Sequence, residues 1–247
     1  NFVANVALAS RKDARDAVVA ARNAFTKWSE ATAYNRGQVL YRISEMMQGR
    51  FDQFVEELSL WNKNKSQVKS EVQNSIDKMI WFAGWTDKLA MVTGSNNPVA
   101  GPFFDFSVPE PTGVVACVSS KEQPLFNLVK TIGSIILSGN TCIAIASKTQ
   151  PLTAVSLSEV IATSDVPAGV VNILTGDYEE IAPWLATHMD VNAFDLTGVN
   201  DKKLAVSLEK DCASNLKRVI RPSVKIDDLS RIKAFLETKT VWHPRGF

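Results

Sequence analysis

The sequence predicts an α/β fold with a doubly wound parallel sheet. Short apolar segments alternate with helical segments between residues 114 and 197, and parallel strands require such crossover connections. Uninterrupted apolar segments of this kind are typical of strands that are buried on both faces. We therefore expect a Rossmann-like sheet in which the strands are Val114–Val118, Thr141–Ala146, Val170–Leu174 and Asn192–Leu196, and the helices are Pro124–Leu137, Leu152–Ala162 and Tyr178–Thr187.

The residues before this sheet predict a series of helices. Apolar side chains three and four positions apart place an apolar stripe on each helix. Ser10 followed by Asp13 predicts a capping box at the first of them. Trp81, Phe82 and Trp85 could form a ligand cage, but a helix packed on the sheet explains them better. The expected helices run from Ser10 through Trp28 and over Asn35–Gln48, Phe51–Trp61 and Gln67–Met91.

Two strands are expected outside the main sheet. The first is a weakly alternating segment over Phe103–Pro109, which follows the turn-forming residues 93–102. Pro109 and Pro111 lack the amide hydrogen that a sheet ladder needs, so they restrict this strand to an edge or an end. The second is a terminal strand over Lys239–Trp242, which Pro244 ends.

The predicted domain boundary follows the main sheet. A strand at Leu216–Ile220 cannot continue past Pro222 at a central position, and Lys225–Leu236 is typical of a linker with a short helix. We therefore expect one domain over residues 1–221, with an excursion near residues 93–112. Residues 222–247 are expected to form a linker and a C-terminal strand, which the family resemblance described below implies to be an oligomerisation strand. The sequence starts at Asn1 without Met, and we expect it to be a fragment.

The composition argues against several classes of function. With 247 residues and a formal net charge of +1, the chain predicts no nucleic-acid partner, and its lysines at 63, 65 and 69 fit a solvated helix face. No apolar run approaches a membrane span of about 18–20 residues, so we expect no membrane partner. The three cysteines lack metal-ligand spacing, which predicts no metal. Cys117 and Cys142 fit small core residues in a reducing, cytoplasmic compartment.

Several motifs resemble the aldehyde dehydrogenase superfamily over nearly the whole chain. The most specific are Pro-Ala-Gly-Val-Val-Asn-Ile at residues 167–173 and Ser-Asn-Leu-Lys-Arg-Val at residues 214–219. The resemblance implies the fold of an NAD(P)-dependent oxidoreductase that acts on aldehydes. It also implies that Phe103–Pro109 and Lys239–Trp242 are oligomerisation elements, because in that family the tail strand adds to the catalytic sheet of a neighbour. Further similar segments are Ser10–Arg42, Trp81–Trp85, Glu110–Val115, Ser138–Thr141 and Pro151–Ala154.

The departures from the family pattern concern its reaction centre. Glu122 replaces an asparagine that donates a hydrogen bond to the substrate oxyanion, and an ionised carboxylate can only accept. Ile145 and Lys148 replace the lysine and glutamate that hold the adenosine ribose. The general-base glutamate aligns with Pro222, and Cys212 aligns with a helix-to-strand position instead of the nucleophile. Residues 223–247 are too few for the family's catalytic domain, so the resemblance implies that this domain is absent and that no catalytic residue remains.

A vestigial cofactor edge is still expected. In the family, a turn at the start of a helix faces the cofactor pyrophosphate. The corresponding residues here are Leu196-Thr197-Gly198-Val199, and Lys203 replaces the second glycine of the family turn. We interpret Gly198 as a requirement of turn geometry rather than a phosphate contact. The vestigial cofactor-binding candidates are Ser120, Ser147, Gly176 and Gly198.

The leading hypothesis is a non-catalytic aldehyde-dehydrogenase-like module that acts in oligomerisation or scaffolding of a larger aldehyde dehydrogenase. It resembles the degenerate second half of long, two-part aldehyde dehydrogenases. This hypothesis expects no cofactor, and its partner is a second copy or an aldehyde dehydrogenase catalytic module. One alternative is part of an NAD(P)-dependent aldehyde dehydrogenase that retains nucleotide binding. Another is a nucleotide sensor without turnover. His188 and His243 accompany no nucleophile-elbow motif.

Overall fold

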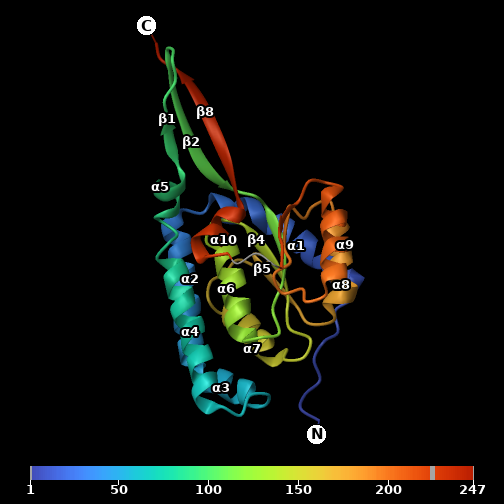
Figure 1. The fold of residues 1–247 in the computed structure, drawn as a ribbon. Helices are drawn as coiled ribbons and strands as arrows, with labels where there is room; N and C mark the ends of the chain where they lie inside the picture. The colour runs from blue at the N-terminus through green and yellow to red at the C-terminus, as the bar shows by residue number, and fades with distance from the viewer. Residues whose placement is uncertain (1, 223–225, 247) are drawn as a thin grey trace.

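The computed structural model describes residues 2–222 and 226–246, and its centre is a five-stranded sheet (Figure 1). Neighbouring strands pair in parallel, in the order β5-β4-β3-β6-β7. The predicted α/β fold with a parallel sheet is therefore confirmed. The strands are β3 (Val114–Val118), β4 (Thr141–Ile145), β5 (Val171–Leu174), β6 (Ala193–Asp195) and β7 (Arg218–Ile220).

Helices cover both faces of this sheet, and each face has its own core. Along β3, Val115 and Cys117 belong to one core, whereas Val114, Ala116 and Val118 belong to the other. This alternation is the two-residue period of a strand that is buried on both faces. The first core lies under α6 (Pro124–Ile136) and α7 (Leu152–Ala162), and the second under α1 (Arg11–Glu30), α8 (Tyr178–Thr187) and α9 (Lys202–Ala213).

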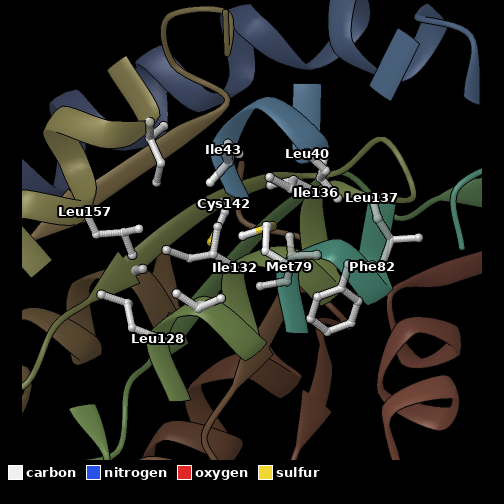
Figure 2. Close-up of a cluster of buried hydrophobic side chains, with 14 of the residues drawn as sticks. Leu40, Ile43, Met79, Phe82, Leu128, Ile132, Ile136, Leu137, Cys142 and Leu157 are labelled. Carbon is white, nitrogen blue, oxygen red and sulfur yellow. The ribbon is translucent and has the colours of Figure 1, made fainter. Parts of the chain in front are cut away.

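A second helical layer covers α6, and Figure 2 shows the side chains that join the layers. Met79 and Phe82 point from this layer toward Ile132 and Ile136 of α6, and all four are fully buried. The predicted aromatic helix therefore packs on α6 and α2 and not directly on the sheet. The layer consists of α2 (Ala33–Gly49), α3 (Phe51–Ser59) and α4 (Lys65–Ala83).

The predicted long helix over residues 67–91 is two helices. Helix α4 ends at Ala83, and α5 (Leu89–Thr93) follows after a turn. The hydroxyl of the buried Thr86 donates to the Ala83 carbonyl at 2.9 Å and satisfies one of the carbonyls that a helix end leaves unpaired. The capping box at α1 is confirmed, because the Ser10 amide donates to the Asp13 carboxylate at 2.8 Å.

A three-stranded antiparallel ribbon projects from the body of the molecule (Figure 1). Its strand order is β1-β2-β8, and β8 is longer than the four residues predicted. The two outer strands therefore leave two open edges, one short and one long. The strands are β1 (Ser95–Asn97), β2 (Phe103–Pro111) and β8 (Leu236–Pro244).

The prolines predict that β2 is an edge strand or that they lie at a strand end. The edge position is wrong, since β2 is the central strand of this ribbon, whereas Pro111 is indeed the last residue of β2. Its prolines are tolerated for a geometric reason. The Thr112 amide donates to the Phe235 carbonyl. Because backbone groups alternate in direction along a strand, even-numbered residues of β2 turn theirs toward β8 and odd-numbered residues turn theirs toward β1. Pro109 and Pro111 turn theirs toward β1, whose pairing reaches only Ser107. These prolines therefore face a stretch where β2 is locally an edge.

The C-terminal segment is anchored in the sheet domain by a buried ion pair. Arg231 of α10 (Asp228–Ala234) binds Asp195, the last residue of β6, and their side chains are 7% and 0% exposed. Ile232 and Phe235 beside it are fully buried in the first core. Residues 226–236 therefore share the core of the predicted first domain, whereas Lys225, the expected start of the linker, lies outside the described residues.

The Arg231→Met variant should lose about 3–5 kcal/mol of unfolding free energy, because it leaves the Asp195 carboxylate buried without its partner. Urea denaturation followed by circular dichroism measures this loss. Arg42→Met is the matched control, since Arg42 pairs with Glu45 at an exposed site and its loss should cost at most about 1 kcal/mol. Equal losses in the two variants would contradict the anchoring role of the buried pair.

Candidate functional site

The four cofactor-binding candidates lie at one edge of the sheet. Ser120, Ser147, Gly176 and Gly198 follow β3, β4, β5 and β6, and the carboxyl ends of parallel strands meet at the same edge. The strand ends stay paired beyond the sheet, since the Ala146 amide donates to the Leu174 carbonyl at 2.9 Å. In open α/β sheets this edge is where ligands bind. The structure therefore brings the four candidate residues to the same edge. What this edge can bind depends on the side chains around it.

Gly198 is required by close packing. A Cβ atom at this position would lie 2.2 Å from the Val118 carbonyl oxygen and 2.6 Å from the Ser119 carbonyl carbon. Both are backbone atoms at the end of β3, so neither can move aside easily. The interpretation of Gly198 as a structural glycine therefore has a direct steric reason.

Gly176 lies under the N-terminal segment of the chain. The Ala9 amide donates to the Thr175 carbonyl at 2.8 Å, and the Thr175 hydroxyl donates to the Ala7 carbonyl at 2.7 Å. A Cβ atom at Gly176 would lie 3.1 Å from the Ala9 nitrogen, and the φ of 152° also favours glycine. The N-terminal segment thus occupies the space next to this candidate.

The two serine candidates make short local contacts. The Ser120 hydroxyl accepts the Glu122 amide at 3.2 Å, and Ser147 and Thr149 share a hydrogen bond of 3.3 Å between their hydroxyls. Such contacts stabilise turns. Ser119 beside them is buried, and its hydroxyl has no hydrogen-bond partner among the described residues.

The amino end of α8 is occupied by the chain's own carboxylate. The Asp177 carboxylate caps α8 by accepting the Glu179 amide at 3.0 Å, and it also binds the Lys148 ammonium. The hydrogen bond from Lys148 lowers the pKa of Asp177, and Asp177 raises the pKa of Lys148. The sequence offers Lys148 as a side chain that could attract a phosphate. In the structure its ammonium group is paired with Asp177.

The amino end of α9 is occupied in the same way. The Asp201 carboxylate accepts the Lys203 amide at 2.7 Å and the Leu204 amide at 3.4 Å. In the family this helix end faces the pyrophosphate. A carboxylate bound to the same amides would repel a phosphate and compete for its hydrogen bonds.

A third carboxylate closes the amino end of α6. Glu71 of α4 accepts the amides of Leu125 and Phe126 at 3.0 and 3.4 Å. Burial raises the pKa of Glu71 and outweighs these two hydrogen bonds, which favour its ionised form. Glu71 and Glu122 line a cleft of about 570 Å³ between α4 and the start of α6. Ionised carboxylates only accept hydrogen bonds, whereas an oxyanion needs donors.

The three cysteines are buried, and His188 makes a local contact with the backbone. Cys212 is buried in α9, and desolvation raises the pKa of its thiol to about 11. Cys117 and Cys142 are fully buried with their sulfur atoms 3.8 Å apart, and their contact and burial raise the pKa of the Cys117 thiol. His188 follows the end of α8, where its Nδ1 accepts the Asp190 amide. A nucleophilic cysteine needs the opposite environment, one that favours the thiolate.

Sequence reasoning missed the three carboxylates that occupy the helix ends. Asp177 and Asp201 stand directly before a helix, and an aspartate at that position is a recognisable capping signal. Glu71 carries no such signal, because it lies inside one helix and caps another.

Within residues 2–222 and 226–246, no helix is long and apolar enough to cross a membrane. The same residues contain no cluster of three or more histidine, cysteine, aspartate or glutamate side chains that could hold a metal ion.

A parallel sheet with helices on both faces defines a doubly wound α/β class of fold, and comparison with known proteins identifies the family. The chain belongs to the aldehyde dehydrogenase family, whose model matches residues 1–221. The human cytosolic 10-formyltetrahydrofolate dehydrogenase is 30% identical over 89% of this chain, which spans 25% of that relative. The cytosolic aldehyde dehydrogenase 1 of Elephantulus edwardii is 31% identical over 88% of this chain, which spans 44% of that protein.

Solved structures show the same partial coverage. A putative aldehyde dehydrogenase from Burkholderia cenocepacia superposes with a TM-score of 0.82 at 28% identity, covering 89% of this chain and 44% of its own. Betaine aldehyde dehydrogenase from Staphylococcus aureus, solved with NAD+, gives a TM-score of 0.81 at 21% identity over similar shares, 89% and 44%, and shows the fold alone. The chain therefore spans about a quarter to less than half of the relatives it matches.

The Gly198→Ala variant should be destabilised by about 1–3 kcal/mol, since its methyl group would overlap the backbone at the end of β3. Gly49→Ala is the control, because a Cβ atom there meets nothing within 4 Å and the helix should gain up to about 1 kcal/mol. Thermal unfolding measures both. An unchanged melting temperature for Gly198→Ala would show that the glycine is not required by packing.

The pH dependence of stability should report on Glu71. Its raised pKa means that the native state binds more protons than the unfolded state above the ordinary carboxyl value, so stability falls as the pH rises through that window. Glu71→Gln keeps an oxygen acceptor and cannot titrate. Denaturation from about pH 4 to about pH 7 should show the wild type losing stability relative to Glu71→Gln.

The Glu71→Ala variant provides the control for this titration. It removes the acceptor for both α6 amides and should be less stable than Glu71→Gln by about 1–2 kcal/mol at every pH. Parallel stability curves for the wild type and Glu71→Gln would contradict the raised pKa.

Proposed function

We propose that this chain is a non-catalytic aldehyde-dehydrogenase-like module that acts in oligomerisation or scaffolding of a larger aldehyde dehydrogenase. The observation that carries the proposal is the occupation of the helix ends at the cofactor edge by the chain's own carboxylates. Asp177 caps α8, Asp201 caps α9 and Glu71 closes α6. The family resemblance implies that a cofactor pyrophosphate faces the amino end of α9, where the Asp201 carboxylate would repel it.

The residues present at this edge do not fit NAD or NADP. Ile145 is fully buried and offers no hydrogen bond to a ribose, and the Lys148 ammonium is held by Asp177. The N-terminal segment also covers Gly176. We therefore derive no reaction step through a nicotinamide group.

The ribbon supports the scaffolding half of the proposal. It projects from the body, and Trp242, Phe104 and Met91 are 58%, 41% and 78% exposed on and beside it. Exposed aromatic side chains next to an open strand edge are typical of a binding surface. The partner that we propose is another copy or an aldehyde dehydrogenase catalytic module. We also propose a cytoplasmic location, as the names of the cytosolic relatives suggest.

The alternative is a portion of an NAD(P)-dependent aldehyde dehydrogenase that retains nucleotide binding. The Ser119 hydroxyl favours it, since this buried donor at the end of β3 has no partner among the described residues. A bound group at the sheet edge could supply that partner.

Calorimetric titration of NAD and of NADP into the purified chain separates the two. Because the helix ends are occupied by carboxylates, we expect no saturable heat up to millimolar nucleotide. The Staphylococcus aureus betaine aldehyde dehydrogenase, which was solved with NAD+, is the positive control. A dissociation constant in the micromolar range would overturn the non-catalytic proposal in favour of the nucleotide-binding alternative.

A further inference from the structure

Among the described residues, no strand pairs with the outer edge of β8. The Arg245 amide donates to Pro102 and the Thr112 amide to Phe235, so odd-numbered residues of β8 turn their backbone groups toward β2. Even-numbered residues turn theirs outward. Thr238, Thr240 and Trp242 therefore present amide hydrogens along an open edge, and such an edge is a template for another strand.

The usual protection of an open edge is weak on β8. Lys239 could block an incoming strand, but its ammonium binds Glu110 of β2 at 3.0 Å and so turns toward the ribbon. Glu237 likewise pairs with Arg218 on the body. The even-numbered side chains facing the same side as Thr240 are uncharged. The edge is thus open and nearly free of repulsive charge.

We propose that two copies of this chain pair β8 against β8, antiparallel, about a two-fold axis at Thr240. The inference rests on the proposed scaffolding function and names its partner. It differs from the arrangement that the family resemblance implies, in which the tail strand adds to the catalytic sheet of a neighbour. The two ribbons then form one continuous sheet through the axis.

The register follows from the strand itself. Leu236–Pro244 is symmetric about Thr240, so this axis pairs Thr240 with Thr240 and Thr238 with Trp242. All of these residues point their backbone groups outward, and in antiparallel sheets such pairs exchange two hydrogen bonds. The amide that Pro244 lacks falls at the end of the strand, opposite Leu236. The complete strand is used, and the ladder loses nothing in its middle.

The side chains also match in this register. Ser107 and Thr240 share a hydrogen bond of 2.9 Å, and Asn97 donates to Ser107 at 2.9 Å, which makes a polar ladder across all three strands. The axis continues this ladder as a Thr240–Thr240 pair, which is a favourable cross-strand combination. Glu237 comes opposite His243, so no like charges meet.

Other symmetric registers are poorer. An axis at Lys239 pairs only residues 236–242 and sets two lysines directly opposite each other, which is destabilising. An axis at Val241 pairs only residues 238–244 and places Lys239 opposite His243. Axes at Thr238 or Trp242 use shorter stretches still. Of these axes, the one at Thr240 pairs the longest stretch of β8 and sets no like charges opposite each other.

Disulfide trapping tests the register. With the axis at Thr240, two Thr240→Cys residues would have Cα atoms about 5.5 Å apart, within the range of a disulfide. Two Thr238→Cys residues would be displaced by about 14 Å along the strand. The native Cys117, Cys142 and Cys212 are buried and provide no competing exposed thiol. Under mild oxidation by oxidised glutathione, Thr240→Cys should form covalent dimers at least tenfold faster than Thr238→Cys.

Sedimentation of proline variants tests the edge. Thr240→Pro removes an outward amide and leaves the β2–β8 ladder intact, so it should shift the dimer to monomer. Asn96→Pro is the matched control, since Asn96 turns outward on the opposite edge of the ribbon, on β1, and its replacement should leave the dimer unchanged. Circular dichroism confirms that both variants fold.

The outcomes separate this inference from the proposed function. A wild-type chain that stays monomeric at high micromolar concentration, or equal trapping of the two cysteine variants, overturns β8 self-pairing. The scaffolding proposal survives that result if an added aldehyde dehydrogenase catalytic module co-elutes with the chain and fails if none does. Dimers trapped at Thr240 together with micromolar nucleotide binding would support self-pairing and overturn the non-catalytic function.

Discussion

The buried pair between Asp195 and Arg231 is the interaction on which the arrangement of the chain depends. It joins Asp195, at the carboxyl end of the interior strand β6, to the helix that leads into β8. Because an unpaired charge at this depth is costly, the C-terminal segment is held on the core, and Phe235 and the start of β8 are held with it. The position of the ribbon is thus fixed by a charge pair inside the sheet domain.

The carboxyl edge of the sheet, where Asp195 also lies, carries the argument for the proposal that the chain binds no nucleotide. Helix amino ends attract anions, and an empty one leaves amides unsatisfied. Asp177, Asp201 and Glu71 satisfy these amides from within the chain. Ile145 and Lys148 also differ from the lysine and glutamate that the family pattern has at these positions. Lys148 binds Asp177, which is one of the capping carboxylates. Under the proposed function, the sheet is kept and its carboxyl edge serves only as part of a scaffold.

Local patterns predicted the fold well, and contacts between distant residues account for what they missed. The strands and most helices follow from hydrophobic periodicity, and the candidate residues were placed at one edge because parallel strands end together. The break after Ala83 is accompanied by a hydrogen bond from the buried Thr86 hydroxyl, which the spacing of apolar residues does not show. Proline is usually excluded from central strands because it lacks an amide hydrogen. In β2 this exclusion does not apply, because Pro109 and Pro111 turn toward the side where β1 has already ended. The Arg231–Asp195 pair joins residues 36 positions apart, and no local signal shows it.

Hydrogen exchange of individual backbone amides, followed by NMR with and without NAD, tests the central claim most directly. The claim is that the chain's own carboxylates occupy the helix ends at the cofactor edge. It predicts that the Glu179, Lys203 and Leu125 amides are protected without nucleotide and that millimolar NAD leaves their exchange rates unchanged. Rapid exchange that slows when NAD is added would contradict it, because the helix ends would then be free sites that the nucleotide fills.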